Sequence, residues 1–166
     1  MQHLNFYKST LIILFLALIA FFQSCDRDKC ENVICNGPES YCLDGFCVCP
    51  QGYEGPNCDI LSQDKYIGNY FVSESCNPGT ASGWSFSYIS PGNGIDKITF
   101  SNALNLGLTA EAVINGNFIT FPQQNLGSIQ FAGQGSFIEN ANRIEITYEY
   151  YRNGTANRCT AYLTKQ

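Results

Sequence analysis

Cysteine is the residue type whose number and spacing point most directly to chemistry in this chain. The 166 residues include nine cysteines, a single histidine and a single methionine. Such a density of cysteine persists as disulfides only in an oxidising compartment, so we expect an exported protein. Because nine is an odd number, one thiol needs a fate other than an intramolecular bridge.

Catalytic groups are scarce in the same sequence. His3 lies in a segment that we expect to be removed, and cysteines used in bridges or acylation leave no ordinary base, nucleophile or zinc ligand. Glu145 and Glu149 lie four residues apart on one expected strand. That spacing separates them by about 13 Å, wider than the roughly 5 to 10 Å between the carboxylates of glycosidases. We therefore expect a protein that is not an enzyme.

The charge balance bears on possible partners. Fourteen acidic residues against nine basic ones give a formal net charge of -5, so no positive field is available to collect phosphates. We expect no nucleic-acid partner. Hydrophobic residues make up 45% of the chain and charged residues 14%, which is typical of one or two small folded units.

The N-terminal segment has the pattern of a secretory signal. Lys8 is followed by an apolar run of twelve residues, 11–22, which is too short to span a bilayer. The sequence Phe22-Gln23-Ser24-Cys25 resembles the lipobox of bacterial lipoproteins. That resemblance implies that residues 1–24 are removed and that Cys25 is acylated, for example with palmitate, which anchors the chain in a membrane. Acylation leaves eight cysteines for bridges; the alternative is an ordinary signal peptide with Cys25 free or paired between chains.

Residues 25–29 would then form an acylated tether. Their sequence after the cysteine, Asp26-Arg27-Asp28-Lys29, resembles the surface-export signals of Bacteroidetes lipoproteins. We therefore expect a lipid-anchored protein of the bacterial cell envelope, in the outer membrane and exposed at the cell surface. In enterobacteria an aspartate in this position would instead indicate retention in the inner membrane.

Residues 30–58 contain six cysteines with gaps of four, six, four, one and eight residues. This spacing, with the closing sequence CVCPQGYEGPNC, resembles an EGF-like domain. A module of this size cannot bury a sufficient apolar core, so its bridges would hold it together. The resemblance implies three disulfides: Cys30–Cys42, Cys35–Cys47 and Cys49–Cys58.

Some EGF-like domains bind calcium through acidic residues near the first cysteine. Asp26, Asp28 and Glu31 offer oxygen ligands of the right hardness. Lys29 departs from the family's calcium pattern, because it stands where those domains carry Glu or Gln. A calcium site is therefore a minor alternative, and we expect no other cofactor.

Residues 59–63 form a linker, and residues 64–166 have the pattern of an all-β domain. Short alternating runs are separated by turn residues at intervals of roughly 8 to 12 residues. The clearest alternation is in 143–151, where Ile144, Ile146, Tyr148 and Tyr150 share one face. The predicted strands are 66–75, 83–90, 95–101, 107–114, 117–122, 128–135, 143–151 and 157–165.

Eight antiparallel strands can form an up-and-down β-barrel or a β-sandwich. Cys76 ends the first predicted strand and Cys159 opens the last. In an up-and-down barrel these strands are antiparallel neighbours, so a Cys76–Cys159 bridge fits the closure; a sandwich also accommodates it. The sequence Gly68-Asn69-Tyr70 is similar to the Gly-x-Trp of lipocalins, and the whole chain resembles small Bacteroidetes lipoproteins with an EGF-like domain followed by a lipocalin-like barrel. That resemblance implies no particular activity.

Aromatic residues are the remaining candidates for binding. Trp84, Phe86 and Tyr88 alternate on one face of the second predicted strand, and Tyr148 and Tyr150 share a face of the seventh. If these rings point inward they fill the barrel or line a pocket for one small apolar ligand. If they point outward they suggest a contact surface for a glycan or a protein. We expect a binding, adhesion or scaffold module on an EGF-like spacer, with a small-ligand carrier as the alternative.

Overall fold

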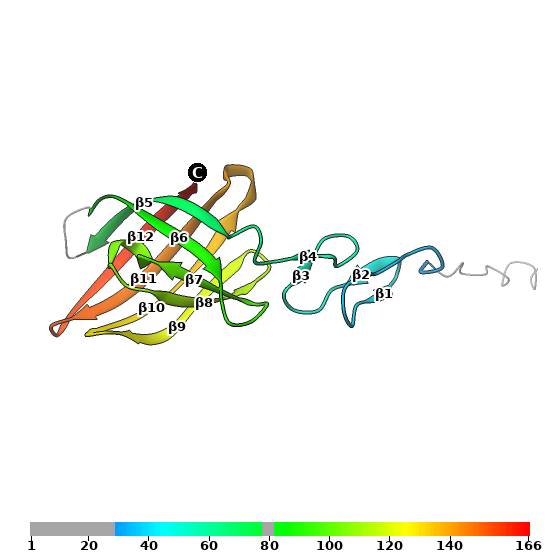
Figure 1. Cartoon of the computed structure of the whole chain (residues 1–166), viewed down its shortest axis with the longest axis horizontal. Coiled ribbons are helices and arrows are strands. Elements are labelled where there is room, and N and C mark those ends of the chain that lie inside the picture. Colours follow the sequence, from blue (N-terminus) through cyan, green and yellow to red (C-terminus); the bar gives the residue numbers. More distant parts are fainter. Residues whose placement is uncertain (1–28, 78–81) are drawn as a thin grey trace, which may run out of the picture.

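The chain folds into a small disulfide module followed by a closed β-barrel. The computed structural model describes residues 29–77 and 82–166. The disulfide module, residues 30–58, extends from one end of the barrel (Figure 1). Within the described ranges, no helix has the length and apolar character needed to cross a bilayer.

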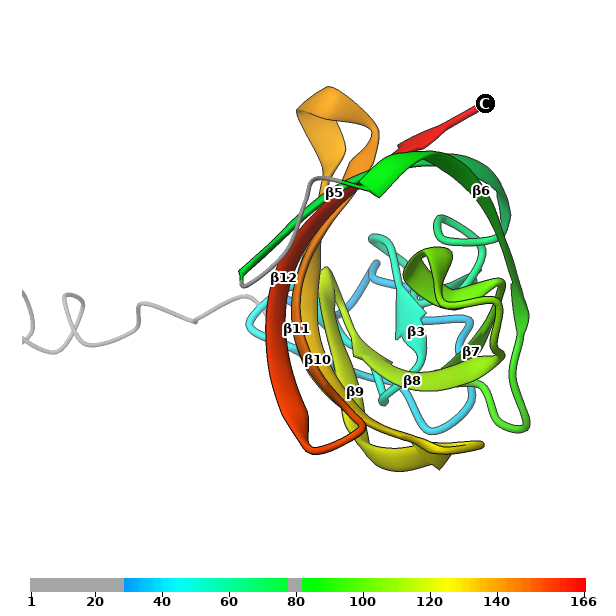
Figure 2. The same cartoon turned by 90° about the vertical axis from the view of Figure 1, so that its left-hand side faces the viewer.

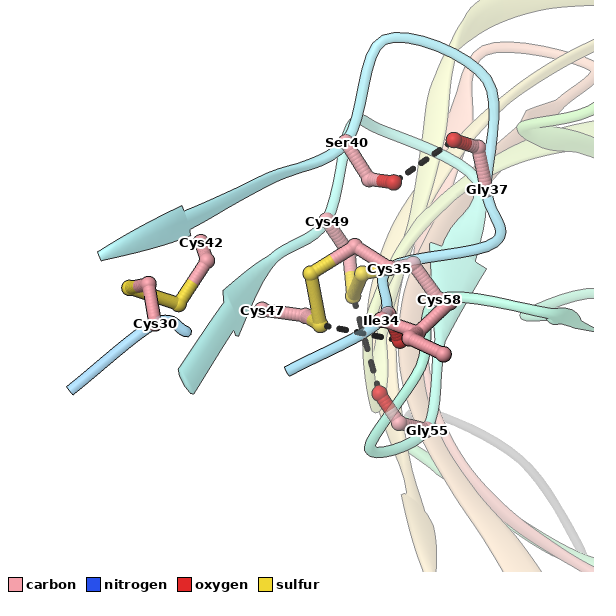
Figure 3. Close-up of a disulfide and its surroundings, with 10 residues drawn as sticks. All are labelled: Cys30, Ile34, Cys35, Gly37, Ser40, Cys42, Cys47, Cys49, Gly55 and Cys58. Atoms are coloured by element: carbon pink, nitrogen blue, oxygen red, sulfur yellow. Dashed lines mark hydrogen bonds between the residues drawn. A yellow bond between two sulfur atoms is a disulfide. The ribbon is translucent and has the colours of Figure 1, made fainter. Parts of the chain in front are cut away.

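One short hairpin lies within the disulfide module and a second forms at its C-terminal boundary, and three disulfides cross-link the module. Strand β1 (Tyr41–Leu43) pairs with β2 (Phe46–Val48), and β3 (Tyr53–Glu54) pairs with β4 (Ile60–Leu61). Figure 3 shows the bridges that tie the first hairpin and its flanking loops together. The three bonds are Cys30–Cys42, Cys35–Cys47 and Cys49–Cys58, the pairing that the resemblance to an EGF-like domain implied.

The barrel consists of eight antiparallel strands in an up-and-down arrangement, as predicted; the sandwich alternative is wrong. Each strand pairs with the next in the sequence, and the last pairs with the first, so the sheet has no free edge. Figure 2, viewed from the end away from the disulfide module, shows the strands as a ring. The strands are β5 (Gly68–Asn77), β6 (Ser82–Pro91), β7 (Lys97–Ser101), β8 (Ala110–Asn115), β9 (Phe118–Leu126), β10 (Ile129–Ile138), β11 (Arg143–Arg152) and β12 (Thr155–Lys165).

The closure between β12 and β5 is covalent as well as hydrogen-bonded. Cys159 lies directly opposite Cys76 in the ladder, and their sulfurs form a disulfide with the two Cα atoms 4.1 Å apart. The predicted bridge is confirmed. It fixes the register of the pair of strands that are most distant in the sequence.

All eight strands differ from their predicted bounds by at least one residue, and two of the larger differences have identifiable reasons. β8 begins at Ala110 rather than at 107, because the preceding residues include a 3-10 turn, η1 (Ala103–Asn105), with a left-handed glycine at Gly107. β9 runs on to Leu126, past the predicted end at Pro122. Its pairing with β10 shifts register between Phe131 and Gly133, and this bulge accommodates the proline within the strand.

The hydrophobic core fills the interior of the barrel. Neighbouring rings contact one another in a series that runs from β7 through β9 and β10 to β11, with centroids 4.9 to 6.2 Å apart. At the far end η1 inserts Leu104, which is fully buried, and in Figure 2 this turn lies inside the ring of strands. The rings of the series are Phe100, Phe121, Phe131, Tyr148 and Tyr150.

Candidate functional site

Four exposed rings lie on the outer wall formed by β12, β5 and β6. Phe71 and Phe86 face each other across the β5–β6 ladder with ring centroids 4.6 Å apart. Tyr88 lies two residues further along β6, and Tyr162 lies on β12, with the guanidinium of Arg143 5.3 Å from its ring centroid. We call Phe71, Phe86, Tyr88 and Tyr162 the aromatic patch.

The aromatic patch corrects the interpretation in which Phe86 and Tyr88 point into the barrel. Phe86 and Tyr88 are 58% and 46% exposed, so they do not line the interior or a pocket within it. Ser85, Ser87 and Ile89 face inward instead. Trp84 lies on the same strand, but its side chain is outside the part of the molecule that the structure describes.

The serines of β6 face inward because the 3-10 turn η1 occupies the space beside them. The 3-10 turn η1 packs against β6 and places the buried Leu104 in the interior. Little volume is left next to β6, so small side chains fit there. Ser87 Oγ donates a hydrogen bond to the carbonyl of Ser101, which satisfies its hydroxyl in that position. Because side chains alternate along a strand, burying Ser85 and Ser87 turns Phe86 and Tyr88 outward.

Tyr148 is buried, and Tyr150 is partly buried against the core. The Tyr148 hydroxyl donates a hydrogen bond to Glu74 Oε2 at 2.5 Å and lies 3.4 Å from the carbonyl oxygen of Leu104. Burial, together with the hydrogen bond to Glu74, raises the pKa of Tyr148 well above its usual range.

Glu74 is a buried carboxylate that the sequence analysis missed. It lies on the inward face of β5 with Tyr70 and Val72, so the alternation of that strand contained the signal. Its path to Tyr148 crosses β12 at Ala161, whose methyl group leaves room for the longer side chain. Ser85 Oγ is also buried and has no hydrogen-bond partner among the described residues. The interior is therefore polar as well as aromatic at this end.

The outer wall formed by β9, β10 and β11 carries a shallow polar groove, which reaches β12 at Thr160. Three adjoining hollows of about 330 to 390 Å³ lie end to end along β10, where Ala132 presents only a methyl group between Gln130 and Gln134. Tyr151 lines one end and Phe118 the other. Phe118 is 70% exposed. The polar lining consists of Gln123, Gln130, Gln134, Ser136, Thr120, Thr147, Thr160, Glu145 and Glu149; we call this the polar groove.

The outward carboxylates of β11 are engaged in ion pairs. Glu145 pairs with Arg143, and Glu149 pairs with Arg158. These ion pairs neutralise the negative charge of the polar groove along β11. Its hydrogen-bonding groups are mainly amides and hydroxyls, which suit an uncharged ligand rich in hydroxyl groups.

The residues proposed for calcium and acylation are only partly within the described ranges. Cys25, Asp26 and Asp28 lie outside them, while Glu31 is described in the disulfide module. Among the residues described, no three histidine, cysteine, aspartate or glutamate side chains cluster in a way that could hold a metal ion.

No protein-family model, curated protein sequence or solved structure matches this chain.

Proposed function

We propose that this chain is a lipid-anchored binding module of the bacterial cell envelope, with no enzymatic activity. In this proposal Cys25 carries the acyl group and anchors the chain in the outer membrane. The disulfide module serves as an EGF-like spacer, and the barrel presents its outer walls to a protein or glycan partner at the cell surface.

The aromatic patch carries this proposal. Large apolar rings on the outside of a barrel lose contact with water when a partner covers them, and so contribute to binding rather than to folding. Phe71 and Phe86 form a continuous platform, with Tyr88 beside it on β6. Such a platform can stack on the apolar face of a sugar ring or pack against a protein.

The polar groove supports the glycan form of the proposal. Gln130, Gln134 and Ser136 supply amide and hydroxyl groups from β10, Thr147 supplies a hydroxyl from β11, and exposed rings stand at both ends. Linear oligosaccharides offer hydroxyl groups along their length and apolar ring faces for stacking. The two outer walls thus present different chemistry to partners.

Paired variants of the full chain would test which wall binds. F86S/Y88S removes two rings of the aromatic patch, and Q130A/Q134A removes two amides of the polar groove. Both pairs of side chains point away from the core, so the melting temperature should change little. We expect F86S/Y88S to abolish binding to cell-surface proteins or to a panel of envelope polysaccharides of the source bacterium, measured by biolayer interferometry. Unchanged binding by both variants would contradict the proposal.

The small-ligand carrier remains a second candidate because Glu74 and Ser85 place polar groups inside the barrel. The contacting rings of the core favour a filled interior over an apolar pocket. Native mass spectrometry of the chain purified from its own organism distinguishes the two. An additional mass that is lost on denaturation would identify a carrier and its cargo.

A further inference from the structure

One face of the β1–β2 hairpin in the disulfide module is entirely apolar. Tyr41 lies opposite Val48, and Leu43 lies opposite Phe46, so these four side chains share a face. The other face carries the directly paired Cys42 and Cys47, whose disulfides connect to Cys30 and Cys35. The bridges therefore hold one face of the hairpin and leave the apolar face without a function in the fold.

This apolar face is exposed to an unusual degree. Tyr41, Leu43 and Phe46 are 57%, 56% and 77% exposed, respectively. A small bridged module has no need for such residues at its surface, because its stability comes from the disulfides. Adjacent exposed rings and aliphatic side chains mark a contact with something apolar.

The turn of the β1–β2 hairpin contacts Lys29, which lies four residues after Cys25 in the sequence. Lys29 Nζ and Asp44 Oδ1 form an ion pair of 3.4 Å at the turn. A Cβ atom placed on Gly45 would lie 3.4 Å from Lys29 Cβ, so the two segments are in contact. Cys25 precedes Lys29 by four residues, which span at most about 14 Å when fully extended.

We propose that the apolar face of this hairpin lies on the lipid bilayer and orients the module relative to the membrane. This inference rests on the proposed acylation of Cys25, which brings the hairpin within reach of the membrane surface. Tyrosine and phenylalanine favour the interface between headgroups and acyl chains. Leu43 and Phe46, nearest the turn, would enter most deeply.

The surface charge of the module determines which lipids it suits. Asp44 stands at the turn itself, with Glu31 and Glu39 elsewhere in the same module. These carboxylates are repelled by anionic headgroups. The hairpin should therefore bind zwitterionic bilayers more strongly than bilayers rich in anionic lipid, and added salt should reduce that difference.

A protein partner fits this face less well than a bilayer does. Stable protein interfaces bury about 800 Å² on each partner, which is more than the side chains of two three-residue strands can supply. The short tether also leaves little room for a folded partner between the hairpin and the membrane.

Quenching by brominated lipid would test the position of the hairpin. The wild-type chain contains one tryptophan, Trp84 in the barrel, which provides the background emission. The acylated full-length F46W variant would be reconstituted in phosphatidylcholine vesicles with brominated acyl chains. We expect its added emission to be strongly quenched. The matched control is Y151W, at an exposed position at the far end of the barrel, and its added emission should be unaffected.

A second measurement separates this inference from the acylation itself. The unacylated mature chain, residues 25–166 with Cys25→Ser, would be titrated with phosphatidylcholine vesicles, with and without L43S/F46S. We expect the double substitution to weaken the remaining partition about tenfold or more.

An acylated chain that binds vesicles with no quenching at F46W would overturn the inference and leave the proposed anchor intact. Purified chain that carries no acyl group would refute the proposed anchor, and the Cys25→Ser titration would still report on the hairpin. Self-association that L43S/F46S abolishes, without any effect on vesicle binding, would identify a second copy as the occupant and also overturn the inference.

Discussion

Glu74 and Tyr148 form a buried polar pair inside a barrel that is otherwise filled with apolar side chains. The tyrosine hydroxyl donates to the carboxylate, and both side chains are almost completely removed from water. A buried carboxylate is costly unless it is hydrogen-bonded, so each hydrogen bond that it accepts contributes to the stability of the fold. The pair joins β5 to β11 across the intervening β12.

We predict that Tyr148→Phe destabilises the barrel by about 1 to 3 kcal/mol, because it removes a donor from a buried carboxylate while preserving the ring. Urea denaturation followed by circular dichroism would measure the change. Ser85→Ala is the control, since its hydroxyl has no partner among the described residues, and its removal should leave stability unchanged or slightly higher. Equal losses in both variants would contradict a specific role for the Tyr148–Glu74 hydrogen bond.

Three buried tyrosines make the stability of the barrel sensitive to alkaline pH. Burial raises the pKa of Tyr70 to about 12 and those of Tyr66 and Tyr148 further still. In the unfolded chain these phenols have their ordinary pKa of about 10. The folded state therefore binds more protons above that pH, so its stability is fully present below pH 10 and falls as the pH rises toward 12 and beyond.

This prediction can be checked by urea midpoints measured between pH 8 and 11.5, alongside phenolate absorbance at 295 nm. We expect a constant midpoint up to about pH 9, a decline above pH 10, and three tyrosines that ionise only when the barrel unfolds. Complete ionisation of all tyrosines near pH 10 in a chain that remains folded would contradict it.

At the scale of strands, the alternation of apolar and polar residues predicted which side chains of β11 are buried, but it did not predict which side chains of β6 are buried. On β11 the buried Ile144, Ile146 and Tyr148 alternate with outward polar residues, as the sequence indicated. On β6 both faces are plausible from the sequence, because serines alternate with aromatics. The deciding contact comes from η1, a turn whose position in the barrel no periodic pattern reveals.

The Cys76–Cys159 bridge was predictable because it follows from the order of the strands. It closes a segment with a sequence separation of 83 residues. In the chain-entropy model, losing this bridge lowers the free energy of unfolding by on the order of 4.5 kcal/mol, less any strain in the folded state. The two strands also share a long hydrogen-bonded ladder from Asn77 to Tyr70, so the closure does not depend on the bridge alone.

We therefore predict that C76A/C159A lowers the free energy of unfolding by about 2 to 4 kcal/mol while the barrel stays folded. Denaturant unfolding would give the change in stability, and the far-ultraviolet circular dichroism spectrum should keep its shape. C30A/C42A is the matched control. It removes a bridge with a sequence separation of 12 from the disulfide module and should leave the barrel transition unchanged. A collapse of the β spectrum in C76A/C159A would show that the ladder cannot close unaided.

At the scale of the whole molecule, polar contacts hold the disulfide module against the near end of the barrel. Lys65 Nζ donates to Glu54 of the module at 2.6 Å and to Asn117 of the barrel at 2.7 Å. Gln51 donates to Asp96 across the same junction. The order of a disulfide-rich module followed by a β-barrel could be predicted from composition and cysteine spacing. The docking could not, since it depends on isolated side chains distant in sequence with no repeating pattern.

These contacts join the module to the barrel, so the walls of the barrel would be held in a defined orientation to the membrane if the hairpin lies on it. Lys65 is central to this junction, because one ammonium group contacts both parts and is only 15% exposed. We predict that Lys65→Met, which keeps the apolar stem, frees the module to move relative to the barrel.

In solution, Lys65→Met should broaden the distribution of maximum dimensions in small-angle X-ray scattering. It should also give the module faster tumbling than the barrel in NMR relaxation, whereas the wild type tumbles as one unit. The barrel transition should weaken by about 1 to 3 kcal/mol, since Glu54 and Asn117 lose a charged donor. Lys29→Met, which removes the exposed ion pair at the far tip of the module, is the control and should leave both measurements unchanged. Uniform tumbling of Lys65→Met would mean that Gln51–Asp96 and the contact of Gly52 with Ile95 hold the junction without the lysine.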